Sequence, residues 1–196
     1  MIWAILRQLL TGPGKMQRTI RIYFTADVEG PALELLQRRL PEFYPWPVQF
    51  GQQIALEENE FVPSRNQYRA FLVLQRLRKL GPGGDLGLAI VGADLFETGL
   101  NFVFGEADPR HRRAIISLHR LSSEYPGRPL TRNLFYHRLL TEAVHEIGHL
   151  VDLGHCPVPT CVMHFSNSLV DTDLKGPNFC EDCRNLLMQR THEKDS

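Results

Sequence analysis

The chain has 196 residues, 43% of them hydrophobic, which is long enough for one well-buried core and short for two. Lys and Arg together number 22, as do Asp and Glu, so the sequence lacks the basic excess that binding to nucleic acids or acidic membranes requires. We therefore expect a single domain with neither kind of partner.

Residues 1–10 are apolar but too few to span a bilayer. They also lack the basic start and the small-residue cleavage site of a signal peptide. We expect them to form a short docking or partly disordered extension that could contact a partner.

Strands and helices alternate through the first half of the sequence. Residues 19–24 alternate between apolar and polar side chains as a strand does, and the Gly-Pro pair at 30–31 opens a helix that runs to about residue 40. Residues 45–54 contain prolines and evenly spaced apolar residues, which predicts a short or edge strand. The Pro-Ser pair at 63–64 predicts the start of a helix with a broad apolar face, ending before Gly81.

Three more strands are predicted in the middle of the chain. Residues 86–91 form a nearly continuous apolar run, typical of a strand that is covered on both faces in the middle of a sheet. Residues 102–104 and 114–118 are two further candidates, joined by a polar loop that contains Gly105 and Asp108. The alternation of strands and helices predicts an α/β architecture with a largely parallel sheet.

A long helix is predicted from about Thr131 to Asp152. Its apolar residues recur four, three and four positions apart, at Leu140, Val144, Ile147 and Val151. Beyond it, prolines and glycines interrupt the chain, so we expect residues 155–183 to form a loop-rich lobe and residues 181–190 to form a last helix.

The long helix carries His145 and His149, which lie on one face about a turn apart, so that both imidazoles can reach one metal ion. Glu146, between them, is angled toward a metal-bound water, which is the position of a general base. A third histidine, His155, follows after five intervening residues. Three histidine ligands that leave a fourth position for water are typical of a catalytic zinc.

All four cysteines of the chain follow these three histidines. They are spaced as C-x4-C and C-x2-C with eighteen residues between the pairs, at Cys156, Cys161, Cys180 and Cys183. This spacing is close to that of a structural zinc site with four cysteine ligands, and two disulfides are the alternative. Because thiolates are needed for such a site and nothing at the N-terminus suggests export, we expect a cytoplasmic protein.

Two residues after Cys161 stands Met163. With this methionine the sequence resembles the archaemetzincins, a branch of the metzincin peptidases in which a methionine in a tight turn lies beneath the catalytic zinc. The residues that carry the resemblance are His145, Glu146, His149, His155, Cys156, Cys161, Met163, Cys180 and Cys183. A weaker resemblance at residues 100–105 and 114–118 places most of residues 86–183 inside the match.

The resemblance implies a compact, metzincin-like α/β domain with a twisted, mixed and mostly parallel sheet flanked by helices. It implies one metallopeptidase domain over residues 1–196. An N-terminal lobe, residues 1–154, would end in the zinc helix, and a C-terminal lobe, residues 155–196, would hold the Met-turn and the four-cysteine zinc. It also implies a substrate that lies extended along an edge strand above the zinc helix, for which residues 102–107 are the best candidate.

One residue departs from the family pattern. The archaemetzincins have glycine three residues after the second histidine, where the helix turns sharply, whereas this sequence has Asp152 there and a glycine at Gly154. Asp is among the few residues besides glycine that adopt a left-handed backbone at moderate cost. We therefore expect the turn to be kept.

We predict a zinc-dependent peptidase with two zinc ions per chain, one catalytic at the histidines and one structural at the cysteines. Glu146 would take a proton from the zinc-bound water, which attacks the peptide carbonyl, without a covalent nucleophile. The substrate would be a peptide or protein, and we expect a monomer. The alternative is a binding protein of the same fold with little or no turnover. The neutral charge balance argues against a third possibility, a nucleic-acid-binding zinc knuckle.

Overall fold

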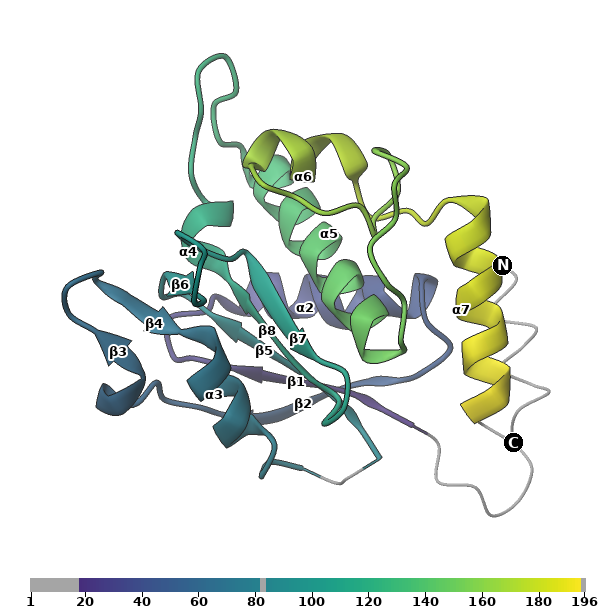
Figure 1. The fold of residues 1–196 in the computed structure, drawn as a ribbon, viewed down its shortest axis with the longest axis horizontal. Coiled ribbons are helices and arrows are strands. Elements are labelled where there is room, and N and C mark those ends of the chain that lie inside the picture. Colours follow the sequence, from purple (N-terminus) through teal and green to yellow (C-terminus); the bar gives the residue numbers. More distant parts are fainter. Residues whose placement is uncertain (1–17, 82–83, 195–196) are drawn as a thin grey trace.

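The computed structural model describes residues 18–81 and 84–194, drawn in colour in Figure 1. The N-terminal extension expected over residues 1–10 lies outside the described residues. Within the described ranges, no helix combines the length and the apolar character that crossing a membrane requires.

A five-stranded sheet forms the centre of the molecule, in the order β2-β1-β5-β8-β7 (Figure 1). Its strands are β1 (Ile20–Phe24), β2 (Val48–Gln53), β5 (Leu86–Val91), β7 (Gly105–Asp108) and β8 (Arg113–Ser117). The first four strands in that order run parallel, and β7 pairs antiparallel with β8 at one edge. The mixed, mostly parallel sheet predicted for this chain is therefore confirmed.

Strand β5 lies in the middle of the sheet because its side chains are apolar at nearly every position. All of its residues are buried, and it pairs with β1 on one side and with β8 on the other. A strand covered on both faces buries alternate side chains in two different cores. Leu88 belongs to one buried cluster, and its neighbour Ala89 belongs to the other.

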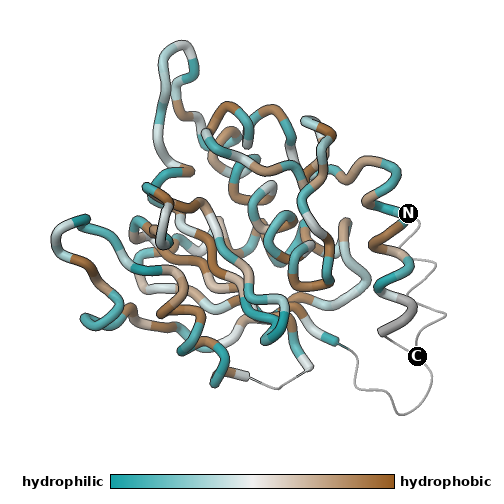
Figure 2. Tube along the Cα trace, viewed as in Figure 1, coloured by the Kyte–Doolittle hydropathy of each residue, from teal (hydrophilic) through white to brown (hydrophobic). Residues whose placement is uncertain are grey.

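Helices cover both faces of this sheet (Figure 1). Helices α2 (Gly30–Arg39) and α5 (Arg132–Leu150) contribute to the larger buried cluster on one face, and α3 (Ala70–Leu77) contributes to the smaller cluster on the other. Figure 2 shows hydrophobic segments along the central strands and hydrophilic segments along the outer loops. The short helices are η1 (Leu40–Glu42), η2 (Glu58–Glu60) and α4 (Leu118–Leu121).

The prediction of a helix from residue 63 was wrong at its start. A second, three-stranded sheet begins here, with β3 (Phe61–Val62) antiparallel to β4 (Gln67–Arg69), and β4 pairs with β6 (Leu95–Phe96). The turn between β3 and β4 ends on Asn66, whose φ of 54° lies in the left-handed region that asparagine tolerates. The Pro-Ser pair therefore starts a hairpin turn, and the helix begins only at Ala70.

The strand expected at residues 102–104 was also misplaced. Only Val103 of that segment forms a bridge, to Leu95, and the strand that pairs with β8 is β7, within the predicted polar loop. All residues of β7 are only partly buried. An edge strand with this intermediate burial lacks the apolar alternation that marks a strand in a sequence.

The chain after α5 consists mostly of turns, as expected, with helix α6 (Leu169–Lys175) among them. The last helix, α7 (Glu181–Lys194), is confirmed and extends past residue 190. Cys161 and Met163 belong to the same buried cluster as α2 and α5. The two segments share one core, so a single domain remains our proposal, with the division at residue 154 marking where α5 gives way to the turns.

Candidate metal centres and active-site cleft

Helix α5, which carries two of the predicted ligands, has a defined cap at each end. At its start, the Thr131 hydroxyl accepts a hydrogen bond from the backbone N–H of Leu134 (3.1 Å). At its end, the N–H of Asp152 donates to the carbonyl of His149 (3.0 Å), and Asp152 has a φ of 65°. Asp152 therefore makes the left-handed turn expected of it in place of glycine, and the chain reverses toward His155.

The structure brings the predicted histidine ligands together. One ring nitrogen from each of His145, His149 and His155 lies within 4.8 Å of the others, and the Nε2 atoms of the first two are 3.1 Å apart. The Nδ1 atoms of these two lie 2.7 Å from the carbonyl oxygen of Val162 and 2.8 Å from that of Leu153, respectively. Since a carbonyl oxygen only accepts, both Nδ1 atoms carry the proton and both Nε2 atoms present lone pairs to each other. A cation between them would satisfy both, so this donor set fits a metal ion.

Burial also keeps these rings in the form that binds metals. It lowers the pKa of His145 well below the ordinary value of 6.5, and it lowers the pKa values of His149 and His155 as well. The positive charge of Lys175 lowers all three pKa values further. The imidazoles are therefore neutral at pH 7, as metal binding requires.

Glu146 lies beside the histidines and against strand β7. It is 4% exposed, and its Oε2 has no hydrogen-bond partner among the described residues. Burial raises the pKa of this carboxyl well above its ordinary value, and the negative charge of Glu142 adds to the increase. A Cβ placed on Gly105 would lie only 2.6 Å from Oε1, so glycine is what allows β7 to pass so close to the carboxylate.

Met163 packs against helix α5 at Gly148, the residue before His149. It is fully buried, and a Cβ placed on Gly148 would lie 2.5 Å from its Sδ, so the thioether lies against the backbone of α5 beside His149. The Met163 carbonyl accepts a hydrogen bond from the N–H of Cys156 (2.9 Å), the residue that follows His155. This contact holds the chain that presents the third histidine close to the end of α5.

The four cysteines form a second cluster with free thiols. Their Sγ atoms all lie within 4.8 Å of one another, at Cys156, Cys161, Cys180 and Cys183. Two of them, Cys156 and Cys180, have Sγ atoms 3.8 Å apart. A tetrahedron with zinc–sulfur bonds of about 2.3 Å has an edge of about 3.8 Å, so this spacing fits one metal ion held by four sulfurs and is far longer than a disulfide bond.

A cavity of about 540 Å³ includes the three histidines and Glu146 in its lining. Residues 100–107, which lead into and form most of β7, contribute to the lining, as do residues 165–167, which follow Met163. Glu142 of α5 and Lys175 of α6 also line it. This cleft combines a candidate metal site, a buried carboxylate and the edge of a sheet.

Sequence analysis missed one ion pair in the cleft. Lys175 Nζ lies 3.2 Å from Glu142 Oε1, and the two side chains are 0% and 3% exposed. Nζ also donates to the carbonyl of His164 (3.2 Å), and the Thr172 hydroxyl donates to Glu142 (3.2 Å). Glu142 could have been found, because it lies three residues before His145 on the same helix. Lys175 could not, because only the fold brings α6 against α5.

A family model and curated relatives match this chain. The model described as "Peptidase family M54" matches residues 75–189. The archaemetzincin of Pyrococcus abyssi is 42% identical over 183 residues, which cover 88% of this chain and 95% of that protein. The archaemetzincin of Pyrococcus furiosus is 48% identical over 186 residues, covering 89% and 95%.

Solved structures agree with this assignment. The archaemetzincin of Methanopyrus kandleri superposes with a TM-score of 0.79 at 32% identity, covering 92% of this chain and 99% of that one. The archaemetzincin of Archaeoglobus fulgidus, solved with malonate, has a TM-score of 0.74 at 34% identity, covering 85% and 98%. A structure described as a zinc-dependent peptidase, from Methanocorpusculum labreanum, has a TM-score of 0.77 at 31% identity, covering 86% and 99%. The chain therefore belongs to the archaemetzincins, the zinc-dependent peptidases of family M54.

Proposed function

We propose that His145, His149 and His155 hold the catalytic zinc of this peptidase and that Glu146 is its general base. The observation that carries this proposal is the pair of Nε2 lone pairs 3.1 Å apart, together with the buried Oε2 of Glu146, which has no hydrogen-bond partner within the described part of the chain. Neither arrangement is stable by itself, because buried polar atoms are normally hydrogen-bonded. Both are expected where a cation and a reacting molecule complete the site.

A zinc ion with three protein ligands supplies a fourth position for water, lowers the pKa of that water to about 7 and polarises a carbonyl group. Glu146 would accept the proton of the attacking water and return it to the amine that leaves. Burial raises the pKa of this carboxyl, and the positive charge of a bound zinc would oppose that increase and favour the unprotonated form that a general base needs. Among the described residues, Glu146 Oε2 has no hydrogen-bond partner, so we assign the proton to it.

The edge of strand β7 supports an extended binding mode for the peptide. The N–H of Ser117 donates to the carbonyl of Phe104 (2.8 Å), which makes these two residues a hydrogen-bonded pair at the start of the β7–β8 ladder. Because such pairs alternate in an antiparallel ladder, Gly105 and Ala107 direct their N–H and C=O groups away from β8. We propose that an extended substrate pairs with these groups, within the segment 102–107 inferred from the family resemblance.

The cysteine cluster would hold a second zinc with a structural role. Residues 155–180 contain one short helix, α6, and otherwise turns, so they have little regular secondary structure of their own. A metal bound by four thiolates would tie the two ends of this segment together, from Cys156 to Cys180.

Cleavage of a peptide library by the wild type and by Glu146→Gln, with and without a chelator, tests the catalytic proposal. We expect cleavage that the chelator abolishes and that Glu146→Gln reduces at least a hundredfold, because it removes the base without changing the shape of the side chain. Equal residual cleavage by both proteins would favour the alternative, a zinc-stabilised peptide-binding protein.

Metal analysis tests the two sites separately. We expect two zinc ions per wild-type chain, and one after either the double substitution of His145 and His149 by alanine or the substitution Cys180→Ser. His119→Ala is the matched control, because this histidine lies outside both clusters, and it should keep both ions. A single zinc in the wild type would contradict one of the two assignments.

A further inference from the structure

The segment before β7, residues 97–104, forms one wall of the cleft, and we call it the cleft wall. It contains no helix and no strand, only the bridge of Val103 to Leu95. Leu100 within it is 46% exposed. The buried ring of Phe104 and the bridge of Val103 anchor the end of this segment near β7. The exposed part around Leu100 buries little surface, so its position depends on contacts made by other elements.

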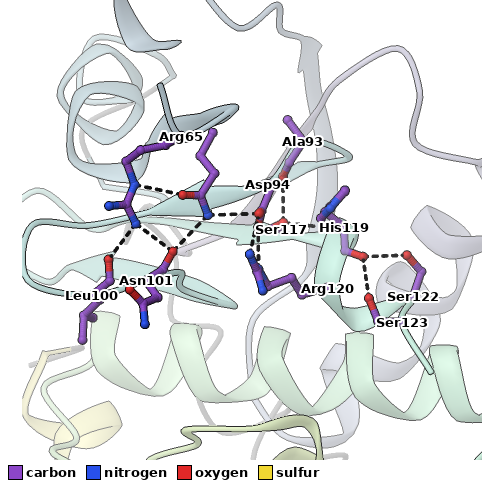
Figure 3. Close-up of polar contacts among 11 residues, drawn as sticks. Arg65, Ala93, Asp94, Leu100, Asn101, Ser117, His119, Arg120, Ser122 and Ser123 are labelled. Atoms are coloured by element: carbon purple, nitrogen blue, oxygen red, sulfur yellow. Dashed lines mark hydrogen bonds and ion pairs between the residues drawn. The ribbon is translucent and has the colours of Figure 1, made fainter. Parts of the chain in front are cut away.

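The hairpin of β3 and β4 supplies the first of these contacts. Arg65 Nη2 donates to the carbonyls of Leu100 (3.1 Å) and Asn101 (2.9 Å), and Gln67 Nε2 donates to the same Asn101 carbonyl (3.0 Å). Arg65 Nε donates to Gln67 Oε1 (3.0 Å), which links the two donors. Figure 3 shows the Arg65 side chain reaching the backbone of Leu100 and Asn101.

Asp94 lies at the centre of this network (Figure 3). Its carboxylate accepts two hydrogen bonds from Arg120, from Nε and Nη2 at 2.8 Å each, and one from Gln67 Nε2 at 3.0 Å. The Arg120 guanidinium in turn lies 4.2 Å from the ring centre of Phe102, which meets the ring of Phe104 edge-on at 5.1 Å. The Asp94 carboxylate therefore orients two groups that hold the cleft wall. These are the Gln67 amide, which donates to the wall's backbone, and the Arg120 guanidinium, which lies against the ring of Phe102.

We propose that Asp94 is a positioning residue for the substrate: through Arg120 and Gln67 it holds the cleft wall in place over β7 and so sets the affinity for the peptide. The proposal rests on the proposed function, in which the peptide binds in this cleft. Asp94 does not line the cavity, whereas Phe102 and Asn101 do. An ordered wall binds the peptide without the loss of entropy that ordering it during binding would require.

If Asp94 only stabilised the fold, its loss would not weaken peptide binding. A second ion pair of the chain serves as a control that distinguishes this purely structural role from a positioning role. Arg21 and Asp85 form an ion pair at 2.8 Å with side chains 20% and 10% exposed, and Arg120 and Asp94 form one at 2.8 Å with side chains 36% and 10% exposed. Asp85 immediately precedes strand β5, whereas Asp94 follows it, so the two pairs lie at opposite ends of the same buried strand. Loss of either pair should destabilise the protein similarly, and only one pair contacts the cleft wall.

The test compares Asp94→Asn with Asp85→Asn in the zinc-loaded protein. KM and kcat are measured on a peptide that the wild type cleaves, and the Kd for the same peptide is measured in a Glu146→Gln background that does not cleave it. We expect Asp94→Asn to raise KM and Kd about tenfold while kcat changes less than twofold and both zinc ions remain. Asp85→Asn should lower the melting temperature without changing KM or Kd.

Unchanged KM and Kd in Asp94→Asn, or an equal rise in Asp85→Asn, would overturn the proposal. If Asp94→Asn does not fold, Arg120→Lys and Arg120→Met decide, because lysine keeps the charge but not the paired contact and should give a smaller rise in Kd than methionine. A wild type that cleaves no peptide would count against the proposed function alone, because the Kd of a library peptide would still measure the effect of Asp94.

Discussion

Gly105 leaves room for the carboxylate of Glu146, and the substitution Gly105→Ala should displace it. The new Cβ would lie 2.6 Å from Oε1 and 2.8 Å from both Cγ and Cδ of Glu146. Carbon atoms in contact are normally at least about 3.5 Å apart, so the side chain must withdraw by about 0.7 Å. Glu146 is 4% exposed, and it therefore cannot move into solvent to relieve the contact.

The displacement should lower kcat with little effect on binding. A misplacement of about 1 Å in an active site can reduce the rate by about 100-fold, so we expect kcat to fall by about 10- to 100-fold. This corresponds to about 1.4 to 2.7 kcal/mol of activation free energy. KM should change less than about threefold, because the peptide would pair with the backbone of β7, which keeps its N–H and C=O groups.

The assay is steady-state cleavage of one peptide, together with zinc content, by Gly105→Ala and by Gly30→Ala as a control. Nothing lies within 4 Å of a Cβ placed on Gly30, so the same substitution there should leave kcat unchanged. In the Glu146→Gln background, Gly105→Ala should reduce the residual rate no further. The reasoning would be refuted if Gly105→Ala had the same kcat as the wild type, or if a loss of zinc accounted for its lower rate.

Three further predictions concern buried charge and backbone strain. Lys175→Met leaves Glu142 buried without its partner and should lower the free energy of unfolding, measured by denaturant titration, by about 3–5 kcal/mol. The double variant Lys175→Met with Glu142→Leu should show a smaller decrease, because no buried charge remains. Burial raises the pKa of Glu106 from 4.5 to about 7, so the folded protein binds the proton of this carboxyl more tightly than the unfolded chain does. The free energy of unfolding therefore falls as the pH rises from 4.5 to about 7. Glu106→Gln should therefore unfold at the same denaturant concentration as the wild type at pH 4 and be more stable at pH 8 by roughly 1–2 kcal/mol, a figure reduced for partial exposure; no difference at pH 8 would contradict the shift. Asp152→Ala should lower the melting temperature through about 1 kcal/mol of left-handed strain, and Asp152→Gly should not, because glycine accepts a φ of 65°.

The clustering of the three histidines could be predicted because local geometry alone brings them together. His145 and His149 share a face of one helix, and a single turn at Asp152 returns the chain to His155. The buried run of β5 was equally clear, since a strand in the middle of a sheet must be apolar at nearly every position. In both cases the pattern extends over fewer than about twelve residues and depends on no distant partner.

The cleft could not be predicted to the same degree, because its parts depend on contacts between distant segments. Strand β7 has intermediate burial throughout, so its sequence resembles that of a polar loop. Helix α3 begins later than predicted because a hairpin precedes it, although an asparagine such as Asn66 is typical of a turn. Gly105 gave no sign of its role, because its φ is ordinary and its reason for being glycine is a side chain forty-one positions later.

The histidines and the cleft wall are held by separate sets of contacts. The carbonyls of Val162 and Leu153 orient the histidine rings from the segments that follow α5, whereas Asp94 orders the wall from the turn that follows β5. Within residues 18–81 and 84–194, no hydrogen bond or ion pair joins one set to the other. Substitutions at distant, independent sites usually have additive effects. Although Gly105 follows the cleft wall in sequence, Gly105→Ala acts on the side chain of Glu146, whereas Asp94→Asn acts on Asn101 and Phe102 through Gln67 and Arg120. Combining the two substitutions should therefore multiply the change in KM by the change in kcat, and a double variant no worse than either single one would show that the two effects are coupled.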